Sequence, residues 1–313
     1  MRAKNEIITY LQSIYQGTYK HLKMAQFKNS GSIVGKLLLL YLLFTGPGCV
    51  AQQKGNDDFG NNPSAGHYLP MKDKTKIYYE VYGSGNPIVL LHGGLYGDIS
   101  EYKKLIPQLS KHFQVIAIET RGHAKSEIGH QPYTYSLFAE DAYTIIKHLT
   151  KDSVIVIGFS VGSMIGITLT VDHPEIVKKL VFVSGQLASN LNSPEAIEKI
   201  KKMTGDTIEK QDPDFVRARK KLMPEPQRWN DFFEYFKNSM VVETVFKPEQ
   251  LEAVKCPVLI IGGDRDGIRA EDMVATYRLL PNSSLAIIPN SGHLVFVKRP
   301  DLMDAIILPF VLH

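Results

Sequence analysis

Residues 154–170 read Val-Ile-Val-Ile-Gly-Phe-Ser-Val-Gly-Ser-Met-Ile-Gly-Ile-Thr-Leu-Thr. The first four residues are apolar and β-branched, which is typical of a strand that is buried on both faces. The residues from Val161 onward are small and apolar, so they suit a helix that packs closely against a sheet. The segment therefore predicts a strand, a sharp turn over residues 158–162, and a helix.

The sharp turn predicts a reactive serine. In a strand, G-x-S-x-G, helix arrangement, the serine has a strained backbone and its hydroxyl projects from the sheet edge. Gly158 and Gly162 fit such a turn because larger side chains there would collide with it. The helix that follows points its N-terminus at Ser160, so the backbone N–H of Val161 can stabilise a developing oxyanion. The alternative is a chance G-x-S-x-G pattern in an ordinary turn.

Short apolar strands alternate with helical segments along most of the chain. This alternation predicts a mostly parallel α/β sheet with right-handed crossovers and helices on both faces. An antiparallel hairpin over residues 68–82 precedes it. In parallel sheets the functional site lies at the carboxyl ends of the strands, and Ser160 falls at such an end.

Two further strand ends carry an acid and a histidine. Asp264 and Asp266 follow the apolar run 257–261, and His293 follows the run 285–288, so the chain order is Ser, Asp, His. Acyl transfer needs these types: the histidine takes the serine proton, and the acid fixes the histidine tautomer and stabilises the imidazolium. On the residues alone, either aspartate is a candidate.

Five sequence blocks carry a family resemblance. They are Leu-Leu-His-Gly-Gly at 90–94, Glu-Thr-Arg-Gly-His-Ala-Lys-Ser at 119–126, Gly-Phe-Ser-Val-Gly at 158–162, Gly-Asp-Arg-Asp at 263–266 and Ser-Gly-His at 291–293. With these blocks, residues 67–313 resemble the α/β-hydrolase superfamily, in its lid-bearing esterase, lactonase and peptidase branch. The second block differs from the family pattern, which has Asp and Gly at the positions of Glu119 and Ala124.

The resemblance implies roles for individual residues. The family's acid usually stands three residues after a glycine, which implies Asp266 after Gly263, with Asp264 as the alternative. The second oxyanion donor is implied to be the backbone N–H of Gly94, with Leu95 as the alternative. The backbone N–H of Val161 is the first oxyanion donor. The predicted catalytic residues are Ser160, Asp266 and His293. A serine at the turn also differs from the aspartate of haloalkane dehalogenases and epoxide hydrolases of this fold.

The alternation stops near residue 186 and resumes near residue 257. Residues 186–252 are helical, charged and aromatic, and they predict a lid inserted between core segments 67–185 and 253–313. Its aromatic residues at helical spacing either pack on the core or line an apolar acyl pocket; they are Trp229, Phe232, Phe233 and Phe236. Its basic residues either form a solvated face or bind an acidic substrate or an anionic membrane; they are Arg217, Arg219, Lys220, Lys221 and Arg228.

The N-terminal residues indicate export. Residues 1–36 are basic, residues 37–44 are apolar, and small residues follow, which predicts a secretory signal peptide over residues 1–51. Cleavage either leaves Gln52 first or creates a lipidated Cys49, and Met24 is an alternative start. The other interpretation is an uncleaved anchor or a cytosolic tail. Residues 52–66 predict a flexible linker. The expected location is periplasmic, secreted or lipid-anchored.

Composition limits the partners. The net charge of +4 is small and dispersed, so nucleic acid is not expected. Two cysteines cannot make a disulfide framework. No metal-ligand spacing stands out, and a serine triad needs neither metal nor cofactor. We expect a small-molecule acyl substrate, and a membrane partner only if Cys49 is lipidated. The oligomeric state is left open.

The expected function is that of a serine hydrolase acting on a small carboxylic ester or a related acyl substrate. The alternatives in the same fold are an aminopeptidase, an enol-lactonase or a C–C bond hydrolase. A peptidase would need lid acids to bind the substrate amine, and the lid contains Glu195, Glu198, Glu209 and Glu225. A non-catalytic ligand-binding module is the alternative from another class, and it usually has an incomplete triad.

Overall fold

A computed structural model of the chain describes residues 58–95, 97–187, 194–241 and 246–313. The predicted signal peptide, with Cys49 and Met24, lies outside the described residues, and so does the first part of the predicted linker. Among the helices of the described part, none is both long and apolar enough to cross a membrane.

Eight strands form one sheet in the order β1-β2-β4-β3-β5-β6-β7-β8. The strands are β1 (Gly66–Pro70), β2 (Lys76–Tyr82), β3 (Asn86–Leu91), β4 (Phe113–Ile118), β5 (Val154–Phe159), β6 (Val177–Val183), β7 (Val258–Gly263) and β8 (Ser283–Ile288). Strand β2 is antiparallel to both β1 and β4, and all the other pairs are parallel. The predicted mostly parallel α/β class is confirmed.

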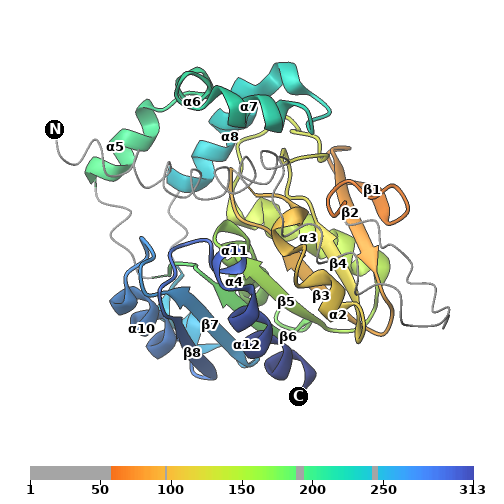
Figure 1. Ribbon diagram of the computed structural model, residues 1–313, viewed down its shortest axis with the longest axis vertical. Coiled ribbons are helices and arrows are strands. Elements are labelled where there is room, and N and C mark those ends of the chain that lie inside the picture. Colours follow the sequence, from red (N-terminus) through yellow and green to blue (C-terminus); the bar gives the residue numbers. More distant parts are fainter. Residues whose placement is uncertain (1–57, 96, 188–193, 242–245) are drawn as a thin grey trace, which may run out of the picture. The chain divides into compact units, whose positions relative to one another are not determined.

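One face of the sheet is covered by helical segments from residues 99–109 and 295–312. Alternate strand residues such as Leu90, Ile157 and Ile261 point to this face and are buried with Phe296 and Ile307 in one apolar cluster. Figure 1 looks onto this face, with α11 and α12 in front of the strands. Its helical segments are η3 (Ile99–Tyr102), α2 (Ile106–Leu109), α11 (Val295–Lys298) and α12 (Pro300–Leu312).

The opposite face is covered by α3 (Tyr135–Leu149), α4 (Val161–Asp172) and α10 (Ala270–Leu279). A Cβ built on Gly166 of α4 would lie 3.0 Å from Leu180 and 3.3 Å from Val156, so the helix lies directly on the strands. Apolar burial on both faces is the reason why β5 reads as a continuous apolar run instead of alternating.

The segment between β6 and β7 is helical. It contains α5 (Pro194–Lys202), α6 (Gly205–Gln211), α7 (Pro213–Lys220), η5 (Pro226–Arg228), α8 (Trp229–Val241) and α9 (Pro248–Glu252). Figure 1 shows α5 to α8 gathered beyond one end of the strands. The Tyr133 N–H donates to the Tyr235 carbonyl at 3.1 Å, and the Asn238 amide donates to the Tyr133 carbonyl at 2.8 Å. These bonds join α8 to the segment that precedes α3.

The last residues of the predicted linker make specific hydrogen bonds to the sheet. Two residues of the segment 58–65, Gly60 and Asn62, bind the carboxylate of Glu80, which is fully buried on β2. This carboxylate accepts bonds from the backbone N–H groups of Gly60 and Asn62, each at 2.8 Å, and from the hydroxyls of Tyr78 and Tyr82. The polar composition of this segment predicted a flexible linker. Its hydrogen bonds to Glu80 could not be predicted, because the partner lies about 20 residues further along the chain.

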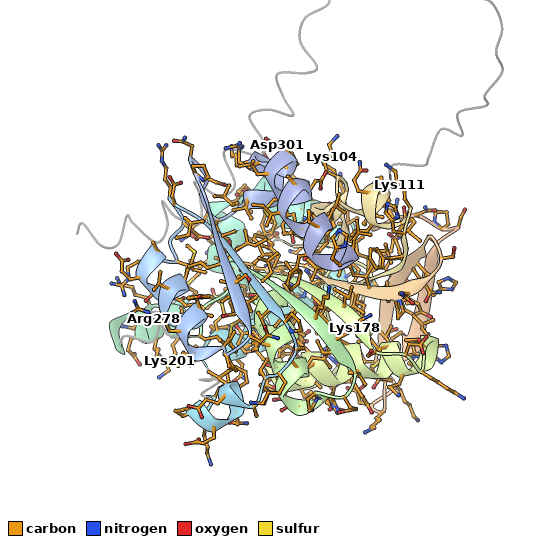
Figure 2. All side chains as sticks on the ribbon, turned by 90° about the horizontal axis from the view of Figure 1, so that it is seen from below. Lys104, Lys111, Lys178, Lys201, Arg278 and Asp301 are labelled. Atoms are coloured by element: carbon orange, nitrogen blue, oxygen red, sulfur yellow. The ribbon has the colours of Figure 1, made fainter. Side chains whose placement is uncertain are left out.

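Charged side chains lie on the outside of the described body. Figure 2 shows lysines, one arginine and one aspartate that extend outward from several different elements; the labelled residues are Lys104, Lys111, Lys178, Lys201, Arg278 and Asp301. The labelled charged side chains therefore lie where water can solvate them.

Candidate active site

Ser160 occupies the turn between β5 and α4. Its backbone has φ 53° and ψ −115°, a conformation that costs free energy in a non-glycine residue and that clusters at functional sites. The Ser160 N–H donates to the carbonyl of Val183 at 2.8 Å, which ties the turn to the end of the neighbouring strand. The sharp strand-to-helix turn predicted from the sequence is therefore present.

Close backbone contacts explain the two glycines of this turn. A Cβ on Gly162 would overlap the Leu91 carbonyl oxygen and lie 2.6 Å from the His92 carbonyl oxygen. A Cβ on Gly158 would overlap the carbonyl group of Gly162. Any side chain at either position would push the helix away from β3 and change the direction of the Ser160 side chain.

His293 lies between Ser160 and Asp266. Its Nε2 atom is 2.9 Å from the Ser160 Oγ, and its Nδ1 atom is 2.9 Å from the Asp266 Oδ1. A carboxylate only accepts hydrogen bonds, so Nδ1 carries the proton and Nε2 accepts from the serine hydroxyl. The Asp266 side chain is fully buried, whereas 12% of the His293 side chain is exposed. The geometry suits a general base next to a hydroxyl.

Asp264 has a different environment. It is exposed, and its Oδ1 accepts the backbone N–H of Ser291 at 3.0 Å. Backbone hydrogen bonds from Asn290 and Ser291 lower the pKa of this carboxyl. Asp264 therefore shapes the loop that carries His293, and Asp266 is the aspartate that contacts the imidazole. The catalytic roles of the three side chains stay predictions.

The two predicted oxyanion donors lie on neighbouring segments. A Cβ on Gly94 would be 2.5 Å from the Val161 side chain, so the loop after β3 touches the start of α4. The N–H of Val161, as the first helical residue, has no partner within the helix. In the described residues the Gly93 N–H is already bound to the Glu101 Oε2 at 2.8 Å. Gly94 and Leu95 both remain candidates for the second donor.

Glu101 is a residue that the sequence did not indicate. Burial raises the pKa of its carboxyl to about 7, although it accepts the Gly93 N–H and so supports the loop after β3. No local pattern distinguishes this glutamate from the surface glutamates, because its role depends on how η3 folds back on the loop.

His92 also has a supporting role: the Thr120 N–H donates to its Nε2 at 2.9 Å, and its Nδ1 lies 2.6 Å from the Gly93 carbonyl.

Four of the five aromatic residues of α8 are buried, with exposed fractions of 2–3%; they are Trp229, Phe232, Phe233 and Phe236. Their burial favours the first of the two predicted roles, packing on the core, and the acyl-pocket role stays a prediction. Phe236 and Phe232 pack edge-on against the His123 ring, at centroid distances of 5.5 and 5.1 Å, and Phe236 also lies close to Gly94. These contacts bring α8 onto the loops that surround Ser160.

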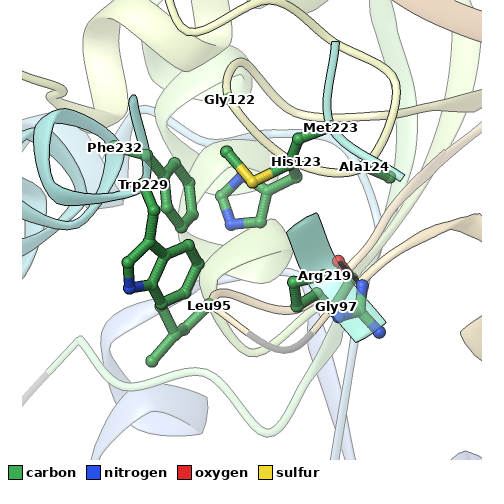
Figure 3. Close-up of a pocket in the computed structure, with 9 residues that line it drawn as sticks. All are labelled: Leu95, Gly97, Gly122, His123, Ala124, Arg219, Met223, Trp229 and Phe232. Atoms are coloured by element: carbon green, nitrogen blue, oxygen red, sulfur yellow. Dashed lines mark hydrogen bonds between the residues drawn. The ribbon is translucent and has the colours of Figure 1, made fainter. Parts of the chain in front are cut away.

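A small cavity lies where α7 and α8 meet the loops after β3 and β4. Figure 3 shows the His123 ring amid the lining side chains, with Phe232 and Met223 close to it. The lining residues are Leu95, Gly97, Gly122, His123, Ala124, Arg219, Met223, Trp229 and Phe232. Ala124, where the family pattern has glycine, adopts a φ of 43°, so the loop retains the left-handed conformation that glycine usually provides.

The predicted basic cluster is largely neutralised. Arg217 pairs with Asp214, Lys220 with Glu209, and Arg228 with Glu225 and Asp231. Arg219 pairs with Asp98 at 2.7 Å, which links α7 to the loop after β3 across 121 positions. These pairs favour the interpretation of the cluster as structural and solvated. In the described part of the chain, no three His, Cys, Asp or Glu residues group as a metal site would need.

Known proteins resemble this chain in sequence. The family model for the alpha/beta hydrolase fold matches residues 86–222. The AB hydrolase superfamily protein YisY of Bacillus subtilis is 27% identical over 270 residues, which cover 78% of this chain and 98% of that protein.

Solved structures share the architecture. An esterase from Exiguobacterium antarcticum superimposes with a TM-score of 0.65 at 20% identity, over 79% of this chain and 100% of that chain. The enol-lactonase from Burkholderia xenovorans superimposes with a TM-score of 0.63 at 18% identity, again over 79% and 100%. At such identities the likeness shows the fold. Together with the family model and the order of the eight strands, it shows that this chain has the α/β-hydrolase fold.

Proposed function

We propose that the protein is a serine hydrolase that acts on a small carboxylic ester or a related acyl substrate. One observation carries the proposal: the two nitrogens of His293 lie 2.9 Å from the Ser160 hydroxyl and 2.9 Å from the Asp266 carboxylate. The strained backbone of Ser160 and the hydrolase relatives support it.

The chemistry has two balanced steps. The Ser160 oxygen attacks the substrate carbonyl while His293 Nε2 takes its proton. The histidine then gives the proton to the leaving alcohol, and an acyl-serine remains. Water repeats the sequence: it loses a proton to His293, attacks the acyl carbon, and Ser160 departs with the proton. Asp266 stabilises the imidazolium in both steps, and the N–H groups of Val161 and Gly94 are proposed to bind the oxyanion.

Residues 186–252 are proposed to act as a lid. The contacts of Phe236 with Gly94 and of Arg219 with Asp98 bring this segment onto the loop after β3, and they support that role. A cover of this kind excludes water from the acyl-enzyme and shapes the acyl pocket.

The aminopeptidase alternative is less favoured. An aminopeptidase would need a lid acid that is free to bind the substrate amine. Three of the four lid acids, Glu198, Glu209 and Glu225, are already paired with a lysine or an arginine, and the side chain of Glu195 lies outside the described residues. The binding-module alternative is also less favoured, because a module without turnover has no need for three hydrogen-bonded triad side chains.

Labelling with a fluorophosphonate tests the proposal on the full-length protein. Intact mass and peptide mapping should find one adduct, on Ser160. Ser160→Ala should abolish labelling, His293→Ala should slow it by several orders of magnitude, and Ser163→Ala, the next serine along α4, should retain it. Labelled enzyme should lose p-nitrophenyl ester hydrolysis. A folded protein that reacts at another residue, or at none, would refute Ser160 as the nucleophile.

We also propose that the protein is exported. This proposal rests on the sequence of residues 1–51 alone. The mass of the mature N-terminus tests it. A terminus at Gln52 indicates ordinary cleavage, a diacylglyceryl adduct on Cys49 indicates a lipoprotein, and a retained Met1 or Met24 would contradict processing.

A further inference from the structure

Two buried side-chain atoms without a partner belong to residues that line the cavity beneath α7 and α8. The first is Nε2 of His123, a residue that is 3% exposed. Its other nitrogen, Nδ1, lies 3.1 Å from the carbonyl oxygen of Arg121. A carbonyl only accepts, so Nδ1 carries the proton and Nε2 of the neutral ring is an acceptor. Burial and the nearby charges of His92 and Arg219 lower the pKa of His123 to about 3, so the ring is neutral near neutral pH.

The second atom is Nε of Arg219, which is buried and has no acceptor in the described part of the chain. Another nitrogen of the same guanidinium, Nη1, donates to Asp98 at 2.7 Å, and this bond holds the group in place. A guanidinium does not lose its proton in proteins, so Nε is a permanent donor. His123 and Arg219 line the same cavity, so the donor and the acceptor belong to one lining.

The rest of the lining is mostly apolar, with Leu95, Met223, Trp229 and Phe232 as the large side chains. The cavity has a volume of about 10 Å³, which is room for about one water-sized group. A group that fits must accept one hydrogen bond and donate another. A methyl group does neither, a carbonyl oxygen only accepts, and an ammonium would be repelled by Arg219.

We propose that this cavity is a subsite for a hydroxyl group of the substrate, which accepts from Arg219 Nε and donates to His123 Nε2. The proposal rests on the proposed ester hydrolysis and names its substrate class, which is hydroxylated acyl esters. Phe236 lies between the subsite and the serine: its ring packs on His123 at one side and approaches Gly94, next to Val161, at the other. An acyl chain attached to Ser160 therefore reaches the subsite only when the Phe236 ring moves aside.

Paired substrates test the subsite on the full-length protein. For acyl chains of increasing length, kcat/KM is measured for a p-nitrophenyl ester that ends in a hydroxyl and for its partner that ends in a methyl. At one chain length the hydroxylated ester should be preferred by roughly 10- to 100-fold, as expected for a hydrogen bond to a charged donor. No preference at any length would overturn the proposal.

Three variants locate the preference. His123→Phe removes the acceptor, and Arg219→Lys removes the Nε donor while leaving a cation for Asp98. In each variant the kcat/KM values of the hydroxylated and methyl-ended esters should differ by no more than roughly threefold, because the hydrogen bond that discriminates between them is lost. Arg217→Lys, the matched change at an exposed position of α7, should retain the preference. Circular dichroism shows whether His123→Phe has folded. If it has not, the preference of Arg219→Lys tests the assignment. Equal preference in all the variants would overturn the assignment.

A binding measurement separates this inference from the proposed function. Calorimetry on Ser160→Ala compares a hydroxylated carboxylic acid with its methyl-ended partner at each chain length, and it needs no turnover. Tighter binding of the hydroxylated acid, lost in the Arg219→Lys double variant, would support the subsite even if no ester is hydrolysed. Equal affinities at every chain length would mean that the cavity holds only a water molecule, and the subsite would be refuted.

Discussion

Asp266, rather than its neighbour Asp264, contacts His293: its Oδ1 lies 2.9 Å from the imidazole Nδ1. The two acids follow the same strand and are separated by one residue. Asp266 turns inward and is fully buried, whereas Asp264 accepts the Ser291 N–H at the surface. The tetrapeptide at residues 263–266 therefore contains one aspartate that bonds to His293 and another that bonds to the loop carrying His293.

We predict that Asp266→Asn lowers kcat/KM for p-nitrophenyl acetate by roughly 10³- to 10⁴-fold, because an amide favours the wrong histidine tautomer. Asp264→Asn is the matched control, since its amide oxygen can still accept the Ser291 N–H. We expect this control to stay within roughly tenfold of wild type and to lower the melting temperature slightly. The reverse ranking would transfer the catalytic role to Asp264.

Gly162→Ala should be strongly destabilising. Its Cβ would overlap the Leu91 carbonyl oxygen, and backbone atoms cannot rotate away, so we expect a loss of about 2 kcal/mol or more in the free energy of unfolding. Gly166→Ala lies one turn further along α4 and meets only side-chain atoms, at 3.0 and 3.3 Å. Urea denaturation should find this control within about 1 kcal/mol of wild type. Equal losses would mean that the close approach at Gly162 is not the cause.

Glu101→Gln should change how stability depends on pH. Burial raises the pKa of Glu101 from its ordinary 4.5 to about 7, so the folded state binds this proton more tightly than the unfolded state. Its contribution to stability is present below pH 4.5 and is lost as the pH rises through 7. Glutamine can accept the Gly93 N–H but does not ionise, so the variant lacks this loss.

Urea unfolding of both proteins from about pH 4 to about pH 8 measures the difference. The stability of the variant relative to wild type should increase across this interval. Glu252→Gln, at an exposed position on α9, is the control and should follow the wild-type profile. A constant difference between Glu101→Gln and wild type would show that Glu101 does not titrate there.

Glu80→Gln should loosen the start of the domain. The Glu80 carboxylate accepts four hydrogen bonds, two of them from the backbone of Gly60 and Asn62. An amide NH₂ would face donors, so we expect a loss of about 2 kcal/mol in the free energy of unfolding. Amide hydrogen exchange should accelerate in residues 58–65. The exposed Glu127→Gln, whose oxygen can still accept the Lys76 N–H, should leave exchange in residues 58–65 unchanged.

Several features could be predicted because they depend on local sequence. The apolar run of β5 and the glycines around Ser160 specify a buried strand and a tight turn, since no other residue types satisfy both burial and close backbone approach. The alternation of strands and helices specified a parallel sheet, and because parallel strands end at the same edge, Ser160, the two aspartates and His293 were expected there. The family resemblance selected Asp266 over Asp264.

The sequence by itself thus determined the fold class, the turn at Ser160 and the set of candidate residues, because those depend on periodicity and on backbone sterics between near neighbours. Only the tertiary structure decided which distant groups meet. Arg219 bonds Asp98 across 121 positions, Glu80 holds residues 58–65, and His123 shares a cavity with Arg219. Such pairings depend on how loops and helices pack, and packing is a property of the whole chain that leaves no periodic signal in any one segment.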